Sequence, residues 1–136
     1  MIKILVTGAT GQLGQCLQKL APIYKELGFT FKNSREFDIT DGKSVKAIFQ
    51  IDQYDLCINC AAYTDVEQAE KTPEIAYKVN AEGVKNLALA CKKNNVNLIH
   101  ISTDYVFDGE KSEPYTVADL PNPINEYGKS ERLKQA

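Results

Sequence analysis

The chain has 136 residues and a formal net charge of −2, and 25% of its side chains are charged. This length suits a single domain that buries about two-thirds of its unfolded surface. Acidic and basic residues are mixed throughout, so no basic face predicts nucleic-acid binding. The apolar N-terminal run is interrupted by Lys3 and ends at Thr7, too early for a signal sequence or a membrane span. The composition therefore predicts a cytoplasmic globular domain without nucleic-acid or membrane partners.

The segment from residue 6 to residue 14, VTGATGQLG, joins an apolar strand to an amphipathic helix through three glycines. Gly8 permits a tight turn, Gly11 lets the backbone approach a pyrophosphate, and Gly14 allows the helix to pack closely on the sheet. The helix start offers unpaired N–H groups to phosphate. The commonest fingerprint is G-x-G-x-x-G, so a generic strand-to-helix turn is the alternative. Its position after the first strand favours a dinucleotide site.

Strands and helices are predicted to alternate along the rest of the chain. Apolar runs predict three more strands, at Phe29–Phe31, Leu56–Asn59 and Val96–Ser102. The first helix has an apolar face and ends before Pro22; that face consists of Leu13, Cys16, Leu17 and Leu20. The second helix is capped by Thr40 or Asp41 and buries Val45, Ile48 and Phe49.

Two helix starts are predicted after the third strand. Thr64 and Glu67 have the spacing of a capping box, and Thr72-Pro73-Glu74 begins the longest helix. The buried face of that helix is expected to contain Ala76, Val79, Asn80, Gly83, Val84, Leu87, Ala88 and Cys91. A final helix begins near Tyr127, after a long loop at Pro114–Pro123 that we expect to be functional.

This order predicts the α/β class, with a Rossmann-like, doubly wound parallel sheet and helices on both faces. The chain reaches Ala136 inside the last predicted helix. We therefore expect residues 1–136 to be an NAD(P)-binding Rossmann domain that stops after about four strands, without its C-terminal substrate-binding region. Such a chain alone should show no turnover.

The four cysteines do not favour a metal centre. Cys57 and Cys60 form a C-x-x-C pair, but the sequence has no second pair and one histidine, so zinc lacks a ligand set. Cys57 falls in an apolar strand, and Cys16 and Cys91 fall on apolar helix faces. Buried, reduced thiols and no bound metal are the prediction.

Side chains suited to carbonyl reduction follow the fourth predicted strand. Ser102, Thr103, Asp104 and Tyr105 emerge beyond its carboxyl end, where open α/β sheets bind ligands. Tyr127 opens the next helix. A hydroxyl can hold a carbonyl oxygen while a phenol protonates it. The two segments therefore indicate a reductase.

Six motifs together resemble the extended short-chain dehydrogenase/reductases, and among them the dTDP-4-dehydrorhamnose reductase family. They are VTGATGQLG at 6–14, FDITD at 37–41, INCAAYTDVEQAE at 58–70, VNAEG at 79–83, STDYVFDG at 102–109 and PxNxYGKS at 123–130. The resemblance implies NADPH- or NADH-dependent reduction of the 4-keto group of dTDP-4-dehydro-L-rhamnose to dTDP-L-rhamnose.

The resemblance also implies residue roles. Thr103 would hydrogen-bond the carbonyl oxygen, Tyr127 would donate the proton, and Asp104 and Tyr105 would lie near the sugar. Residues implied to line the cofactor are Gly8, Gln12, Leu13, Asp38, Ile39, Ala61, Ala62 and Tyr63, with Asn80 supporting strand ends below it. Structural alternatives stay open: Tyr105 and Phe107 as core, Asp104 as a turn or cap residue, and Asn80 as a partner of backbone.

The sequence departs from the family pattern at two positions. The family has Tyr-x-x-x-Lys, whose lysine binds the nicotinamide ribose and lowers the tyrosine pKa, but Glu131 stands here. A carboxylate has the opposite effect on the phenol. Lys129 points to another face, and Lys134 lies about 10 Å from Tyr127 along the helix axis. Val117 replaces the usual glutamate of the long loop.

The second predicted strand ends without an acidic residue that could hold a ribose 2′-OH. Ser34 and Arg35 follow it and could meet a 2′-phosphate, which predicts NADPH binding at least as tight as NADH binding. A solvated loop charge is the alternative for Arg35.

Two other functions fit the same motifs. The regulatory subunit of methionine adenosyltransferase resembles this family without being a reductase, and Glu131 favours such a non-catalytic partner. A sugar-nucleotide epimerase of the same superfamily is the second alternative, but STDYVFDG favours the reductase. For the oligomeric state, a homodimer is the option that the sequence leaves open.

Overall fold

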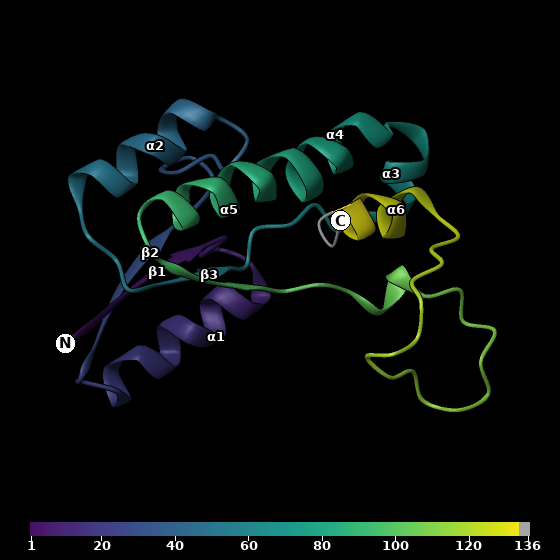
Figure 1. Cartoon of the computed structure of the whole chain (residues 1–136), viewed down its shortest axis with the longest axis horizontal. Coiled ribbons are helices and arrows are strands. Elements are labelled where there is room, and N and C mark those ends of the chain that lie inside the picture. The colour runs from purple at the N-terminus through teal and green to yellow at the C-terminus, as the bar shows by residue number, and fades with distance from the viewer. Residues whose placement is uncertain (134–136) are drawn as a thin grey trace.

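The structure, a computed structural model, describes residues 1–133, which form a four-stranded parallel sheet with helices on both faces (Figure 1). The strands are β1 (Ile2–Thr7), β2 (Leu27–Lys32), β3 (Leu56–Asn59) and β4 (Asn97–His100). One face carries α1 (Gln12–Leu20), and the other carries α2 (Gly42–Ile51) and α5 (Val84–Lys93). The predicted α/β class and doubly wound arrangement are confirmed. Within the same residues, no helix has the length and hydropathy needed to cross a membrane.

The strand order is β2-β1-β3-β4, so the chain changes direction across the sheet between β1 and β3. β1 pairs in parallel with both neighbours: Ile4 lies opposite Phe29 of β2 and Leu56 of β3. In open α/β sheets, a crevice forms outside the carboxyl ends of the strands where the order reverses. The topology therefore points to a ligand site beyond Thr7 and Asn59.

The main core lies between the sheet and helices α2 and α5. It includes Leu5, Val45, Phe49, Cys57, Leu87 and Cys91. The prediction of buried thiols is confirmed for Cys57 and Cys91, and Cys60 is half-buried.

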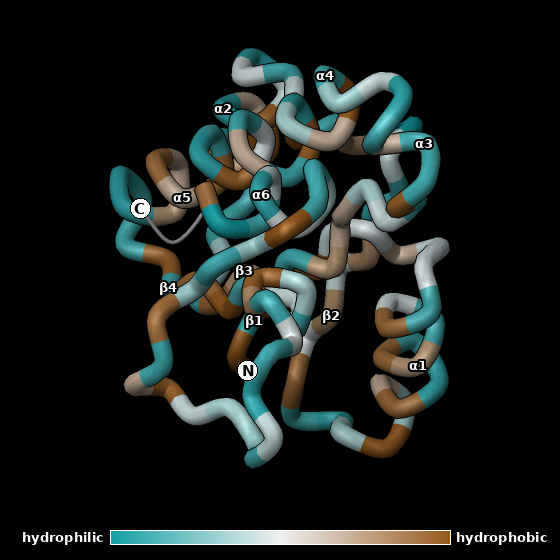
Figure 2. Tube along the Cα trace, turned by 90° about the vertical axis from the view of Figure 1, so that its right-hand side faces the viewer, coloured by the Kyte–Doolittle hydropathy of each residue, from teal (hydrophilic) through white to brown (hydrophobic). Residues whose placement is uncertain are grey.

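The prediction of a buried thiol is wrong for Cys16, which is exposed. Figure 2 shows hydrophobic stretches on both the strands and α1. Gly14 is the buried residue of α1, whereas Leu13 and Leu20 stay substantially exposed. On the same side of the sheet, Ile99 of β4 is also exposed. The predicted buried face of α1 is therefore wrong at Leu13, Cys16 and Leu20, and among its four residues Leu17 alone is half-buried.

The longest predicted helix begins at Pro73, as expected, but contains a π-helical segment. It consists of α4 (Pro73–Tyr77), the π-helical η2 (Lys78–Gly83) and α5. Most of its predicted buried face is confirmed, but Ala88 is exposed and Ala90 is buried instead. Ala88 lies about 100° round the helix from the buried Leu87, at the margin of the apolar face.

Other element boundaries differ by a few residues. The predicted capping box is wrong because α3 (Val66–Lys71) is capped by Asp65, whose side chain accepts from the Gln68 N–H. The second helix is capped by Asp41, one of the two predicted caps. The fourth strand is shorter than predicted, and the last helix, α6 (Glu126–Arg132), begins at the predicted place.

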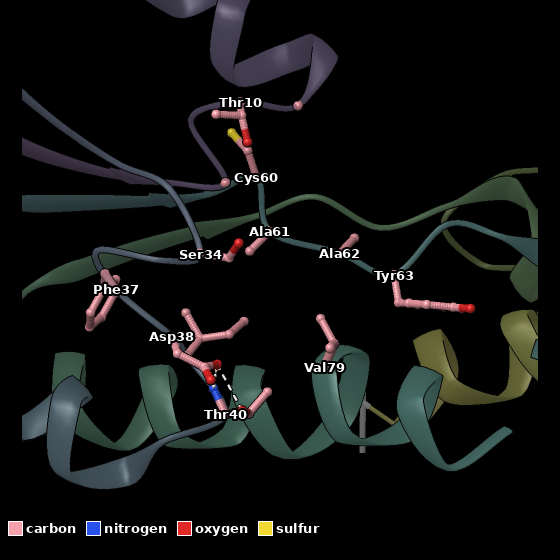
Figure 3. Close-up of a pocket in the computed structure, with 13 residues that line it drawn as sticks. Thr10, Ser34, Phe37, Asp38, Thr40, Cys60, Ala61, Ala62, Tyr63 and Val79 are labelled. Carbon is pink, nitrogen blue, oxygen red and sulfur yellow. Dashed lines mark hydrogen bonds between the residues drawn. The ribbon is translucent and has the colours of Figure 1, made fainter. Parts of the chain in front are cut away.

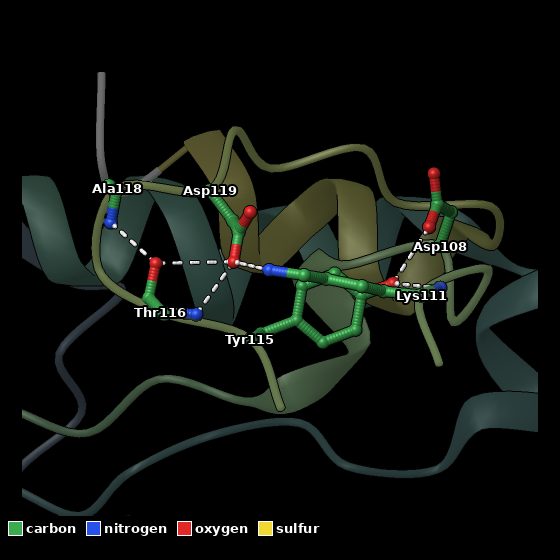
Figure 4. Close-up of polar contacts among 6 residues, drawn as sticks. All are labelled: Asp108, Lys111, Tyr115, Thr116, Ala118 and Asp119. Atoms are coloured by element: carbon green, nitrogen blue, oxygen red, sulfur yellow. Dashed lines mark hydrogen bonds and ion pairs between the residues drawn. The ribbon is translucent and has the colours of Figure 1, made fainter. Parts of the chain in front are cut away.

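The long loop before α6 is held by its own side chains. The polar network contains Asp108, Lys111, Tyr115, Thr116, Ala118 and Asp119 (Figure 4). The Tyr115 hydroxyl donates to Asp108 at 2.9 Å, and Lys111 pairs with Asp119 at 2.7 Å. The Asn122 N–H then donates to the Val106 carbonyl at 2.8 Å. The loop therefore returns to the short 3-10 turn η3 (Asp104–Val106), beside which α6 starts.

Candidate functional site

The predicted glycine turn packs tightly at the end of β1. Gly8 has φ +65°, and a Cβ there would lie 2.5 Å from the Ala61 nitrogen. A Cβ on Gly14 would overlap the Gly8 carbonyl oxygen. Gly11 is exposed and stands at the N-cap of α1, where no side chain within residues 1–133 supplies a capping hydrogen bond. The first N–H groups of α1 are therefore available to an anion.

Two cavities meet at this turn. One has a volume of about 330 Å³ and the other about 570 Å³. Both are lined by Thr10, Gly11, Cys60, Ala61 and Ala62. They therefore form one groove that crosses the carboxyl edge of the sheet at its switch point, with the start of α1 in the middle.

The first cavity lies between the loop after β2 and the segment after β3 (Figure 3). Beyond the shared residues and Gly8, it is lined by Ser34, Phe37, Asp38, Ile39, Thr40, Tyr63 and Val79. Asp38 Oδ1 accepts from the Thr40 N–H at 2.9 Å and from its hydroxyl at 2.8 Å. Arg35 is exposed and is not among the described residues that line this cavity.

The second cavity brings α1, the ends of β3 and β4, and α6 together. Its remaining described lining consists of Gln12, Leu13, Gln15, Asn59, Thr64, Ile101, Ser102, Tyr127 and Glu131. Tyr127 is 7% exposed and Glu131 only 1%. The Tyr105 ring lies edge-on to the Tyr127 ring, with centroids 5.5 Å apart. This cavity therefore has a phenol and a carboxyl group on one wall.

Several groups change the acidity of Tyr127. Burial raises its pKa, a hydrogen bond with Thr103 lowers it, and the charge of Glu131 raises it further. Thr103 itself caps η3 by accepting from the Tyr105 N–H at 3.3 Å. The structure thus brings Thr103 to Tyr127, and the effect of Glu131 has the sign expected from the sequence.

Asn80 links the groove to α6. This fully buried side chain accepts from the Tyr63 N–H at 2.8 Å and donates to the Tyr63 carbonyl at 2.9 Å. It also donates to the Ser130 hydroxyl at 3.1 Å, and Ser130 donates to the Tyr127 carbonyl at 2.7 Å. Asn80 stands in the π-helical segment, a feature that often occurs at functional sites. It therefore positions both the segment after β3 and the helix of Tyr127.

Replacing Asn80 by alanine is expected to destabilise the fold by about 2–3 kcal/mol, because the partly buried backbone groups of Tyr63 and the buried Ser130 hydroxyl lose a hydrogen-bond partner. The free energy of unfolding from urea titration checks this value. Asn94→Ala is the matched control, since Asn94 is exposed and donates to the Ala90 carbonyl of its own helix. Equal losses for the two variants would contradict this role of Asn80.

A second polar network joins three strand ends. Asn59 Oδ1 accepts from the Thr7 hydroxyl and, at 3.1 Å, from the Ala61 N–H. Its amide nitrogen lies 2.9 Å from His100 Nδ1. Because Ala61 lines both cavities, this network fixes the floor of the groove. Our sequence reasoning missed it, although a polar residue ends each of the three strands.

The other predicted site residues lie around the groove's second end. Asp104 and Tyr105 are exposed near Tyr127, and Thr103 is half-buried. Lys129 forms an ion pair with Glu126 at 3.1 Å, on the outside of α6. Lys134 lies outside the described residues.

Sequence reasoning also missed lining residues. They include Thr10, Phe37, Thr40, Cys60, Val79 and Ile101, whereas Ser102, expected near a ligand, does line the second cavity. Most follow strand ends, a signal that could have found them. In residues 1–133, no group of three or more histidine, cysteine or acidic side chains could hold a metal ion.

Comparisons with known proteins identify the family of this chain. The family model described as "RmlD substrate binding domain" matches residues 2–134. The dTDP-4-dehydrorhamnose reductase of Aggregatibacter actinomycetemcomitans is 44% identical over 133 residues, which cover 96% of this chain and 44% of that protein.

Two solved structures support this match. The dTDP-4-dehydrorhamnose reductase of Clostridium acetobutylicum has a TM-score of 0.94 and 42% identity, covering 98% of this chain and 48% of that one. The Bacillus anthracis enzyme, solved with NADP, has a TM-score of 0.94 and 40% identity, with 99% and 48% covered. The chain thus spans about half the length of these relatives. The resemblance to dTDP-4-dehydrorhamnose reductases is confirmed, and the chain belongs to the RmlD substrate binding domain family.

Proposed function

We propose that residues 1–136 form the NAD(P)-binding part of a reductase that converts the 4-keto group of dTDP-4-dehydro-L-rhamnose to the alcohol of dTDP-L-rhamnose. The observation that carries the proposal is the groove itself. It has the uncapped start of α1 at its middle and a buried phenol, Tyr127, at one end. The dTDP-sugar substrate and a cytoplasmic location are parts of this proposal.

The residues of the groove fit a nicotinamide dinucleotide. Gly11 has no side chain to block the approach of a pyrophosphate, and the N–H groups of Gln12 and Leu13 favour its negative charge. Ser34, Asp38 and Ile39 line the cavity that would hold the adenosine half, as do Ala61, Ala62 and Tyr63. Gly8 and Gly14 hold the turn and the helix in the close packing that this cradle needs. When bound, the reduced cofactor supplies the two electrons for carbonyl reduction.

The chain's own residues would handle the proton. The Tyr127 phenol donates it to the carbonyl oxygen, while the Thr103 hydroxyl, which bonds to the same phenol, holds that oxygen. Asp104 and Tyr105 are exposed at this end and would contact the sugar. Because the relatives are about twice as long, we expect the 136-residue chain alone to bind cofactor without turning over substrate.

An assay of cofactor oxidation tests this function, using dTDP-4-dehydro-L-rhamnose and a protein that continues this chain to the length of its relatives. Oxidation that depends on the sugar nucleotide is the expected result. Cofactor binding without oxidation would favour the non-catalytic regulatory role, for which the buried Glu131 beside Tyr127 is the supporting observation.

NADPH is expected to bind this chain at least as tightly as NADH. Ser34 lines the adenosine cavity. Arg35 follows it in the chain and, although it is not among the described residues of the lining, its long side chain would reach a 2′-phosphate bound there. Titration with both cofactors should show that Arg35→Ala weakens the binding of NADPH by about tenfold and leaves the affinity for NADH unchanged. Lys25→Ala is the control for loss of one surface charge, because Lys25 is exposed and precedes β2, at the opposite end of that strand from Arg35. Tenfold tighter NADH binding, or unchanged NADPH affinity in Arg35→Ala, would exclude this preference.

A further inference from the structure

The strand β2 forms one edge of the sheet, and no strand within residues 1–133 pairs with its outer side. The Lys32 carbonyl accepts from the Ala9 N–H, just after β1, so the backbone groups of Lys32 face β1. Successive residues of a strand direct these groups to opposite sides. Thr30 therefore also faces β1, whereas Phe29 and Phe31 direct their N–H and C=O groups away from the sheet.

This edge has none of the features that normally keep two sheet edges apart. Such features are prolines, bulges, very short strands and charges within the strand. β2 has six residues, pairs with β1 in a continuous register, and carries neither a proline nor a charge in the segment Leu27–Phe31. The other edge strand, β4, has only four residues. The edge of β2 is therefore a template for pairing with a further strand.

The side chains of β2 add apolar surface to this edge. Thr30 and Lys32 line a cleft with α2, so the alternate residues Leu27, Phe29 and Phe31 face the α1 side of the sheet. All three are half-buried, and the two phenylalanine rings stack with centroids 5.6 Å apart. A partner strand would cover this apolar area and also satisfy the outward backbone groups.

We propose that β2 pairs with β2 of a second copy of this chain, antiparallel and about a twofold axis at Phe29, so that the two sheets become one. With Phe29 opposite its own copy, the outward groups of Phe31 meet those of Leu27 across the axis. The same register places Glu26 opposite Lys32 of the second copy, and symmetry repeats this pair. A twofold interface of this kind is closed, with β4 at both outer ends.

Charge complementarity favours this register and this partner. Glu26 is exposed, Lys32 is half-buried, and neither has an ion pair of its own in the described part of the chain. Opposite charges directly across antiparallel strands stabilise the pairing, and like charges destabilise it. A shift by one pairing position in either direction would place Glu26 opposite Ser34 or Thr30 instead. The edge thus complements itself, whereas an unrelated peptide would have to supply the same pattern.

Sedimentation equilibrium of the purified 136-residue chain over a range of concentrations tests the proposal. The mass should rise from that of one chain to that of two. Lys32→Glu should weaken the dimer about tenfold, because two attractive pairs become repulsive. Adding Glu26→Lys to that variant exchanges the charges and should restore the dissociation constant to within about threefold. Lys85→Glu, which reverses an exposed charge on α5, is the control and should have no effect.

Amide hydrogen exchange locates the interface without any substitution. Protection of Phe29 and Phe31 should increase with protein concentration, whereas Thr30, which faces β1, should be protected at every concentration. A chain that stays monomeric at about 1 mM would overturn the proposal. A dimer that protects another face, or that tolerates Lys32→Glu as well as Lys85→Glu, would overturn it too. The dinucleotide groove is tested separately, by cofactor titration, so failure of the dimer leaves the proposed function standing.

Discussion

Glu131→Lys is expected to raise the turnover number by about ten- to a hundredfold in a protein that continues this chain to the length of its relatives. Tyr127 must donate a proton, and burial and the charge of Glu131 both raise its pKa. A shift of one pKa unit corresponds to about 1.4 kcal/mol. Replacing an anion by a cation one helical turn from the phenol therefore lowers the activation free energy of proton transfer appreciably. Initial rates measure the effect, and ultraviolet titration of Tyr127 should show a lower pKa in the variant.

Tyr127→Phe is the companion variant and is expected to abolish turnover, because it removes the proton and keeps the buried ring. Tyr24→Phe is the control for loss of a phenol, since Tyr24 is exposed and is not among the described residues that line either cavity of the groove. An unchanged rate in Glu131→Lys together with full activity in Tyr127→Phe would make the tyrosine structural. The non-catalytic, regulatory function would then be the better interpretation.

Gly128→Ala is expected to destabilise the fold by about 2–3 kcal/mol. A Cβ at Gly128 would overlap the Tyr105 carbonyl oxygen and lie 2.9 Å from the Pro123 side chain. Neither the backbone of η3 nor a proline ring can rotate away, so α6 must move and take Tyr127 with it. Urea denaturation measures the loss of stability, and the affinity for NADPH reports the displacement of the second cavity's wall.

Gly42→Ala is the matched control for Gly128→Ala. Gly42 begins α2, and a Cβ there would meet only the Asn86 side chain, at 3.9 Å. Because alanine is the better helix former, this variant should be neutral or slightly more stable. Equal stability of the two variants would contradict the close contact between α6 and η3.

Much of the fold was predictable because local patterns decide it. The strand at Leu56–Asn59 and the helix start at Pro73 occur where the apolar runs and the proline predict them. The glycine turn was predictable as well, since Gly8 needs a positive φ and Gly14 a close approach. These features depend on residues near one another in the sequence.

Features that depend on distant residues were not predictable in the same way. Thr64 and Asp65 are adjacent, and either side chain could cap α3. Asp65 is the cap because of the path that the chain takes after β3, which no local pattern reveals. Cys16 has helical apolar spacing, but its burial depends on what covers that side of the sheet. The contact of Asn80 with Ser130 spans 50 residues, so no local pattern reveals it. The sequence nevertheless indicated that Glu131 and Tyr127 share one face.

Nuclear magnetic resonance of the labelled chain during titration with NADPH tests the central claim, that the groove at the strand switch binds a nicotinamide dinucleotide. The account predicts the largest amide shifts at Gly11, Gln12 and Leu13, which surround the start of α1, and at Ala61, which lines both cavities. The cleft between α2 and α5, marked by Lys46, provides an internal comparison. Shifts concentrated at that cleft, or no shifts at saturating NADPH, would contradict it.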